Sequence, residues 1–122
     1  MLAGDFFTIK NIQSNGSETE AVLGINAEHE IFKGHFPGQP VVPGVCMMQM
    51  IKEILEIVIS KNTRLLRADH AKFLSMIDPR VHATIKASVN WRLAENGEIE
   101  VVSSLFDEST VFLKYRAVFI AK

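Results

Sequence analysis

A histidine lies in a stretch of the chain that proline and glycine make rigid. His35 falls within residues 34–44, which hold three of the four prolines and three of the seven glycines. Proline fixes its own backbone and glycine permits sharp turns, so we expect a stiff, strongly bent loop. An imidazole can carry a proton near neutral pH. The loop therefore offers a base that is held in one place.

An apolar segment follows the loop and predicts a helix over residues 45–60. Most of its positions are apolar, and the polar ones recur at helical spacing, which indicates a largely buried helix with one polar stripe. The stripe consists of Gln49, Lys52, Glu53 and Glu56. The first N–H groups of a helix have no partners within it. The helix start, at Gly44 or Val45, is therefore expected to bind an anion beside His35.

The other regular segments are expected to be β-strands, because they are rich in Val, Ile, Thr and Phe and alternate between apolar and polar residues. The predicted strands cover residues 6–12, 20–25, 64–77, 81–93, 98–106 and 110–121. Residues 29–33 are expected to form a loop. Six strands and one buried helix predict an α+β fold, in which an antiparallel sheet is wrapped around the central helix.

Length and composition favour one domain over residues 1–122 and exclude several function classes. The 13 basic residues are matched by 14 acidic ones, so the chain lacks the positive excess typical of nucleic-acid or membrane-surface binding. No leader or membrane-spanning run is visible, and a single cysteine, Cys46, is compatible with a reducing compartment. We expect a cytoplasmic protein. Its size favours an oligomer.

The loop also resembles that of a known family. The residues His35-Phe36-Pro37-Gly38, followed by Pro40 and then Pro43-Gly44-Val45, resemble the active-site loop of the β-hydroxyacyl-acyl carrier protein dehydratases, which have the hotdog fold. The resemblance implies a homodimer, or a larger assembly of dimers, with an acyl tunnel along the helix. It implies no cofactor, and a substrate carried as a thioester on acyl carrier protein.

The resemblance also implies roles for individual residues. His35 would take the proton next to the thioester carbonyl, and the N–H groups at Gly44 or Val45 would stabilise the charge that develops on the carbonyl oxygen. Phe36, Gly38 and Pro43 complete the expected substrate-binding residues. The expected reaction is the elimination of water from 3-hydroxyacyl thioesters in fatty acid or polyketide-type synthesis.

The sequence departs from the family at the acid. The family carries Asp or Glu five residues after the Pro-Gly glycine, where this chain has Gln49, and an amide cannot donate a proton to the departing hydroxyl. Four residues further on the family usually carries Gln, and this chain has Glu53. Two interpretations are open for Glu53: it replaces the missing acid while Gln49 orients the hydroxyl, or it belongs to the exposed polar stripe.

Two further functions are compatible with the missing acid. The chain could be a non-catalytic, acyl-thioester-binding subunit of a hetero-oligomeric dehydratase, or a hotdog thioesterase in which a helix carboxylate activates water. A metal site is not predicted, because His29, His35 and Cys46 match no zinc spacing. Cys46 is expected to be a small apolar residue of the helix.

Overall fold

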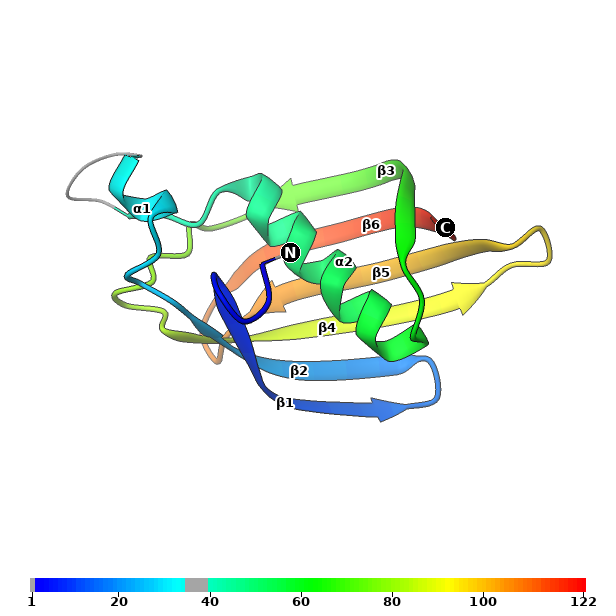
Figure 1. The fold of residues 1–122 in the computed structure, drawn as a ribbon, viewed down its shortest axis with the longest axis horizontal. Coiled ribbons are helices and arrows are strands. Elements are labelled where there is room, and N and C mark those ends of the chain that lie inside the picture. Colours follow the sequence, from blue (N-terminus) through cyan, green and yellow to red (C-terminus); the bar gives the residue numbers. More distant parts are fainter. Residues whose placement is uncertain (1, 35–39) are drawn as a thin grey trace.

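One antiparallel sheet and one long helix form most of the computed structural model, which describes residues 2–34 and 40–122. Each strand runs antiparallel to its neighbours, in the order β1-β2-β4-β5-β6-β3. The elements are β1 (Phe7–Asn15), β2 (Glu18–Ile25), α1 (Ile31–Gly34), α2 (Gly44–Ile59), β3 (Thr63–Phe73), β4 (Thr84–Leu93), β5 (Glu98–Phe106) and β6 (Val111–Ala121). The predicted six-stranded antiparallel sheet with one central helix is confirmed (Figure 1).

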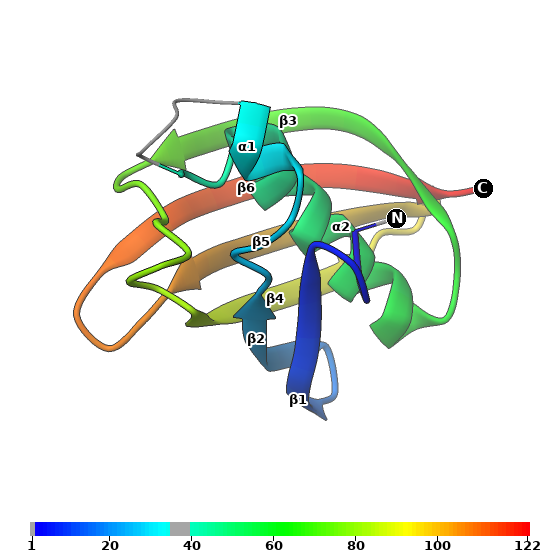
Figure 2. The same cartoon turned by 60° about the vertical axis from the view of Figure 1, so that its left-hand side comes forward.

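The core lies between α2 and one face of the sheet. From both viewing directions α2 crosses the same face, with β1 and β3 at the two edges of the sheet (Figures 1 and 2). The helix contributes Met50, Ile51, Ile54 and Leu55, all fully buried. Their spacing of three and four residues keeps them on one side of the helix. No helix within the described residues is both long enough and apolar enough to span a bilayer.

The helix predicted over residues 45–60 is found within one residue of those bounds, but its predicted polar stripe is not exposed throughout. Glu53 is fully buried, so the expectation that it lies on an exposed polar stripe is wrong. The helix ends at Ser60, whose left-handed backbone (φ 56°) stops the helical path.

Two predicted strands are shorter in the structure. The predicted strand 64–77 ends at Phe73, and the predicted strand 81–93 begins only at Thr84. Pro79 cannot donate to a sheet, and the Asp78 carbonyl accepts the N–H groups of the residues three and four positions later, which bends the chain between the strands. Conversely, the first hairpin is longer than predicted, because β1 and β2 continue to a turn at Gly16, whose φ is 65°.

The expected loop at residues 29–33 contains a short helix instead. The ring nitrogen Nδ1 of His29 accepts the backbone N–H of Ile31 at 3.1 Å, and Nε2 lies 3.1 Å from a carboxylate oxygen of Asp5. A side-chain acceptor at the start of α1 satisfies an N–H group that the helix itself cannot. His29 therefore has a structural role.

Apolar side chains remain on the surface at the sheet edge formed by β3. Every residue of this strand except Thr63 is exposed, including Leu65, Leu66 and Phe73. An edge strand with apolar side chains presents unpaired backbone groups that a second chain can cover.

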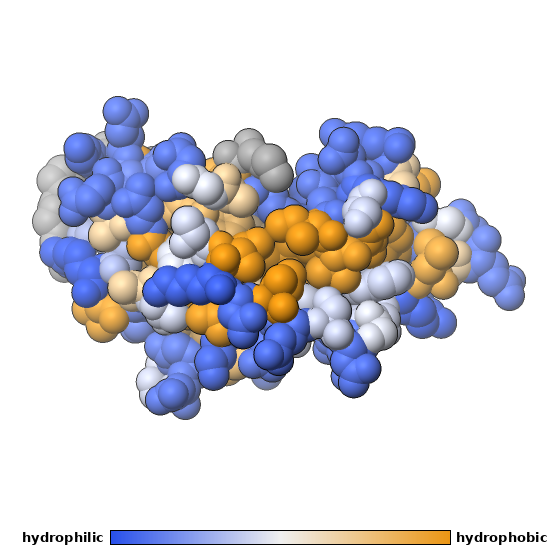
Figure 3. Space-filling view, turned by 60° about the horizontal axis from the view of Figure 1, so that its bottom comes forward, coloured by the Kyte–Doolittle hydropathy of each residue, from blue (hydrophilic) through white to orange (hydrophobic). Residues whose placement is uncertain are grey.

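On another face of the molecule, hydrophobic side chains gather in the middle with hydrophilic ones around them (Figure 3).

The packing of α2 gives a first prediction. Replacing the fully buried Ile54 with Ala should lower the free energy of unfolding by about 2–5 kcal/mol, because the cavity cannot close completely. The matched change Ile57→Ala, on the same helix but at a side chain that is 44% exposed, should alter it by only about 0.5 kcal/mol. Chemical denaturation measures both, and equal losses would contradict the described core.

Candidate functional site

The start of α2 is held by the segment that follows β3. The backbone N–H of Val42 donates to the carbonyl of Ile77 at 2.9 Å, and both side chains are buried. Pro43 then occupies the cap position, where no side chain caps the helix. A Cβ added to Gly44 would meet the ring of Phe73 at 3.0 Å, so the end of β3 lies directly against the first turn.

The first two N–H groups of α2 have no acceptor within residues 2–34 and 40–122. The N–H groups of Cys46 and Met47 donate to the carbonyl of Pro43, whereas no acceptor among the described residues binds those of Gly44 and Val45. The Val45 side chain is 74% exposed. Beside them lies a depression of about 560 Å³, lined by Val42, Gly44, Met47, Phe73, Leu74, Ser75 and Met76. The predicted oxyanion donors thus border a largely apolar hollow.

Three of the predicted site residues, His35, Phe36 and Gly38, lie outside the described residues. The other two substrate-binding residues that precede Val45, Pro43 and Gly44, are described, and they form the cap and the first residue of α2.

Glu53 is the centre of a hydrogen-bond cluster in the interior. Its oxygen Oε1 accepts the backbone N–H groups of Leu2 at 3.0 Å and Ala3 at 2.8 Å. Oxygen Oε2 accepts the N–H of Leu2 at 2.8 Å and the side-chain NH₂ of Gln49 at 2.9 Å. Burying a carboxylate is costly unless donors surround it, and these four contacts supply them. The N-terminal segment accordingly lies against the middle of α2 (Figures 1 and 2).

Gln49 lies between this buried cluster and the surface. Its NH₂ group is used by Glu53, and no described residue donates to its carbonyl oxygen. The side chain lines a small hollow of about 230 Å³ between α2 and the strands β3 and β6. The other residues of this hollow are Val45, Met48, Lys52, Leu65, Tyr115 and Phe119. Gln49 is thus a polar group beside a narrow, mainly apolar space that runs along the helix.

The contacts of Glu53 bear on the interpretation that it replaces the missing acid. Gln49 and Glu53 are neighbours one turn apart, as their spacing predicted, but the carboxylate points inward and each of its oxygens already accepts two hydrogen bonds. A carboxylate has about four lone-pair positions. The N–H groups of Ala3 and Gln49 and the shared N–H of Leu2 engage both oxygens, and the fully buried Glu53 is not exposed to the hollow.

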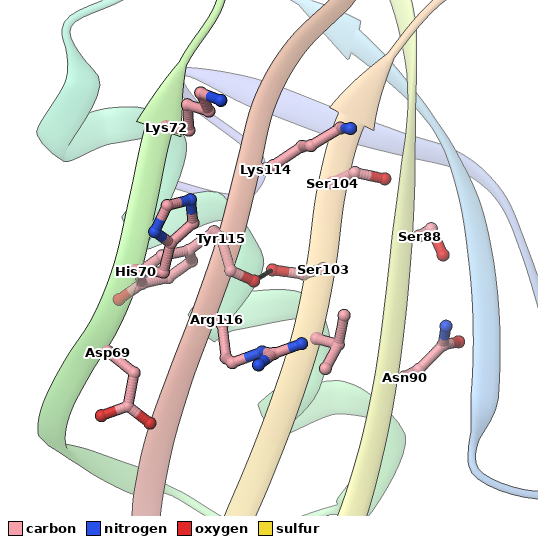
Figure 4. A pocket seen from close by; sticks show the side chains of 11 residues that line it. Asp69, His70, Lys72, Ser88, Asn90, Ser103, Ser104, Lys114, Tyr115 and Arg116 are labelled. Carbon is pink, nitrogen blue, oxygen red and sulfur yellow. Dashed lines mark hydrogen bonds between the residues drawn. The ribbon is translucent and has the colours of Figure 1, made fainter.

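Another hollow lies on the opposite face of the sheet and lacks a catalytic arrangement. It measures about 720 Å³ and includes His70, Lys72, Lys114 and Arg116. Figure 4 shows these side chains standing apart from one another on β3 and β6. The hydrogen bond drawn there joins the Ser103 hydroxyl to the backbone carbonyl of Tyr115. A polar sheet surface of this kind holds no base paired with a nucleophile.

Burial disfavours deprotonation of two other side chains, the Cys46 thiol and the Tyr115 hydroxyl. Burial raises the pKa of the Cys46 thiol, so the thiolate needed for nucleophilic attack is disfavoured. This agrees with its interpretation as a small apolar residue of the helix. Burial also raises the pKa of the Tyr115 hydroxyl, which keeps the proton on this phenol, and Tyr115 lines the same hollow as Gln49. Within residues 2–34 and 40–122, no three potential metal ligands lie together.

The sequence did not reveal the role of the N-terminal backbone. Leu2 and Ala3 bind Glu53 through their peptide N–H groups, and the contact joins residues about 50 positions apart. Backbone donors leave no trace in residue type. A carboxylate on an otherwise apolar helix face was the available sign that interior donors had to exist.

Comparisons with known proteins agree with this geometry. A 3-hydroxyacyl-[acyl-carrier-protein] dehydratase FabZ of Rickettsia bellii is 25% identical over 121 residues, covering 87% of this chain and 82% of the relative. The structure of the dehydratase heterocomplex ApeI:P from Xenorhabdus doucetiae superposes with a TM-score of 0.73 at 17% identity, covering 92% of this chain and 96% of that one.

The same fold also occurs in other enzymes. A thioesterase from Haemophilus influenzae superposes with a TM-score of 0.64 at 12% identity, over 93% of this chain and 76% of that one. The fold is therefore the hotdog fold, which by itself does not choose between these activities. The sequence is more specific, because residues 11–104 match the ApeI-like family, described as ApeI dehydratase. The chain belongs to the ApeI-like family of hotdog-fold dehydratases.

Proposed function

We propose that the protein binds 3-hydroxyacyl thioesters, carried on acyl carrier protein, and eliminates water from them with His35 as the base. The observation that carries the proposal is the pair of N–H groups at Gly44 and Val45, which no described residue accepts and which border an apolar hollow at the start of α2. A proton next to a thioester carbonyl is only weakly acidic, so a base needs donors at the oxygen where charge develops.

Gln49 has the role of holding the departing hydroxyl. It lies just over one helical turn beyond Gly44 and lines the hollow along α2. An amide hydrogen-bonds a hydroxyl but cannot donate the proton that turns it into water. Elimination in this protein therefore proceeds without the family's acid and is slow.

A homodimer formed at β3 would enclose the acyl group. The exposed Leu65 lines the hollow beside Gln49, and Phe73 lines the one beside Gly44, so both hollows open at the edge strand. A second sheet paired with this edge would cover the apolar side chains and turn the hollows into a closed passage.

A second candidate function follows from the position of the carboxylate. In this family the histidine and the acid of one active site come from different subunits. A homodimer of this chain would have Gln49 at both sites, whereas a heterodimer would place an acid from a related partner opposite His35. One complete site per dimer would result. The similarity to the ApeI:P protein of Xenorhabdus doucetiae is compatible with this arrangement, since that protein is a dehydratase heterocomplex.

The thioesterase alternative is less well supported. It requires a helix carboxylate that activates water, and the oxygens of Glu53 are already occupied by two backbone N–H groups and the Gln49 amide.

The base is tested by removing the imidazole. The change His35→Ala should lower the rate of 2-enoyl thioester formation by about 10²- to 10⁴-fold, because proton abstraction loses its acceptor. Formation of the enoyl product by the wild type and the variant is followed spectroscopically, and release of free thiol is measured in parallel. Thiol release without any enoyl product from the wild type would instead establish a thioesterase.

The acid is tested by exchanging the two side chains. The double change Gln49→Glu with Glu53→Gln should raise the dehydration rate at least about tenfold, because it restores a proton donor in the hollow. The new amide at position 53 can still accept from Leu2 and Ala3 while its NH₂ group binds the new carboxylate. The single change Gln49→Glu is the comparison: it puts a carboxyl group where the Gln49 NH₂ group binds Glu53, so the two side chains would have to share one proton. No gain in the double variant would contradict the proposed role of Gln49.

The edge strand is tested by introducing a charge. The change Leu66→Glu should raise the dissociation constant of the homodimer at least about tenfold, because the carboxylate would have to be buried at the interface. The control is Val102→Glu, at an exposed valine in β5 on the outer face of the sheet. Analytical ultracentrifugation measures both, and an equal effect would place the interface elsewhere.

A further inference from the structure

We infer that Glu53 is a positioning residue that fixes the orientation of the Gln49 carboxamide, so that the hollow along α2 presents a hydrogen-bond acceptor and selects acyl chains with a 3-hydroxyl over those with a 3-oxo group. The inference rests on the proposed function, because it concerns which acyl thioesters this site accepts. Its basis is the buried cluster that joins the N-terminal segment, Glu53 and Gln49.

The first step concerns the direction of the hydrogen bonds at Glu53. Peptide N–H groups can only donate, and those of Leu2 and Ala3 contact both carboxylate oxygens at 2.8–3.0 Å. Both oxygens of Glu53 therefore act as acceptors. The N-terminal segment is itself held in place, since the Leu2 carbonyl accepts the N–H groups of Asp5, Phe6 and Phe7.

The second step concerns Gln49. A carboxamide has one donor end and one acceptor end, and only the NH₂ end can bind an acceptor oxygen. Because Glu53 Oε2 lies 2.9 Å from the Gln49 nitrogen, the NH₂ end is directed inward. The carbonyl end is then left for the hollow, where Val45, Leu65 and Tyr115 are neighbours. The buried carboxylate thus decides which end of Gln49 a ligand meets.

The third step is the chemistry of the ligand. At the carbonyl oxygen of Gln49 a 3-hydroxyl can donate a hydrogen bond, whereas a 3-oxo group only accepts and is opposed there. The other polar residues of this hollow, Lys52 and Tyr115, can donate to either group, so the difference between the two ligands arises at Gln49. Unpaired or opposed polar groups in a confined, mostly apolar space reduce affinity by about tenfold or more. The site therefore discriminates between two acyl groups that differ by two hydrogens.

The change Glu53→Gln should reverse this orientation while preserving volume. The new amide oxygen would accept from Leu2 and Ala3, and its NH₂ group would then point to Gln49. Gln49 must offer its carbonyl end inward and its NH₂ end to the hollow. An NH₂ group in the hollow can donate to a 3-oxo ligand, and it can also donate to a 3-hydroxyl, whose oxygen can act as an acceptor.

The experiment compares two probes that cannot be hydrolysed at the thioester. They are pantetheine amides of equal chain length, one carrying a 3-hydroxyacyl and the other a 3-oxoacyl group, and calorimetry gives their dissociation constants. The wild type should bind the hydroxy probe at least about tenfold more tightly. In Glu53→Gln the ratio should fall to within about threefold or invert. The control Glu56→Gln, a change of the same kind on the same helix at a residue bonded to Thr63, should keep the wild-type ratio.

A second measurement tests the orientation without a ligand. The side-chain NH₂ resonances of Gln49, assigned by NMR, should shift in Glu53→Gln and stay unchanged in Glu56→Gln. Equal binding of the two probes to the wild type, or an unchanged ratio and unchanged resonances in Glu53→Gln, would overturn the inference and leave the proposed function standing. Failure of the wild type to bind either probe would overturn the proposed function, and the resonances would still decide the role of Glu53.

Discussion

The site and the N-terminal segment both depend on one constraint, the burial of the Glu53 carboxylate of α2 in the protein interior. Glu53 is fully buried, and a charged or strongly polar group in that position must be surrounded by donors. The N-terminal segment supplies backbone donors and Gln49 supplies a side-chain donor. The first residues of the chain, the middle of α2 and the hollow along it are therefore parts of one hydrogen-bonded unit.

The end of β3 links this unit to the rest of the site. Phe73 packs against Gly44, and Ile77 accepts the N–H of Val42, so the start of α2 is located by the strand that also forms an edge of the sheet. Leu65, earlier in the same strand, lines the hollow beside Gln49. Whatever chain covers this edge would also form one wall of the binding site, which couples assembly to substrate recognition.

The features that the sequence predicted are those set by local pattern. The helix 45–60, the strand 98–106 and the overall architecture follow from the spacing of apolar residues, which depends only on neighbours along the chain. The same spacing placed Glu53 on the polar side of the helix, because a pattern of residue types does not show that the backbone of Leu2 and Ala3 lies against that face. Similarly, the alternating Val81 lies outside its predicted strand, because Pro79 and the carbonyl of Asp78 bend the chain before the strand begins.

The exchange of amide and carboxylate across one helical turn changes the chemistry while it keeps the contact between them. In the family order the acid comes first along the helix and the amide follows four residues later. In this chain the amide faces the hollow, and the carboxylate behind it binds the N-terminal backbone. The hydrogen bond between positions 49 and 53 can form in either order, since each order pairs one NH₂ group with one carboxylate. The charge, however, moves from the site into the interior, and the site exchanges a proton donor for an acceptor of fixed orientation. In the proposed function, loss of the acid and recognition of the hydroxyl would thus have the same physical cause.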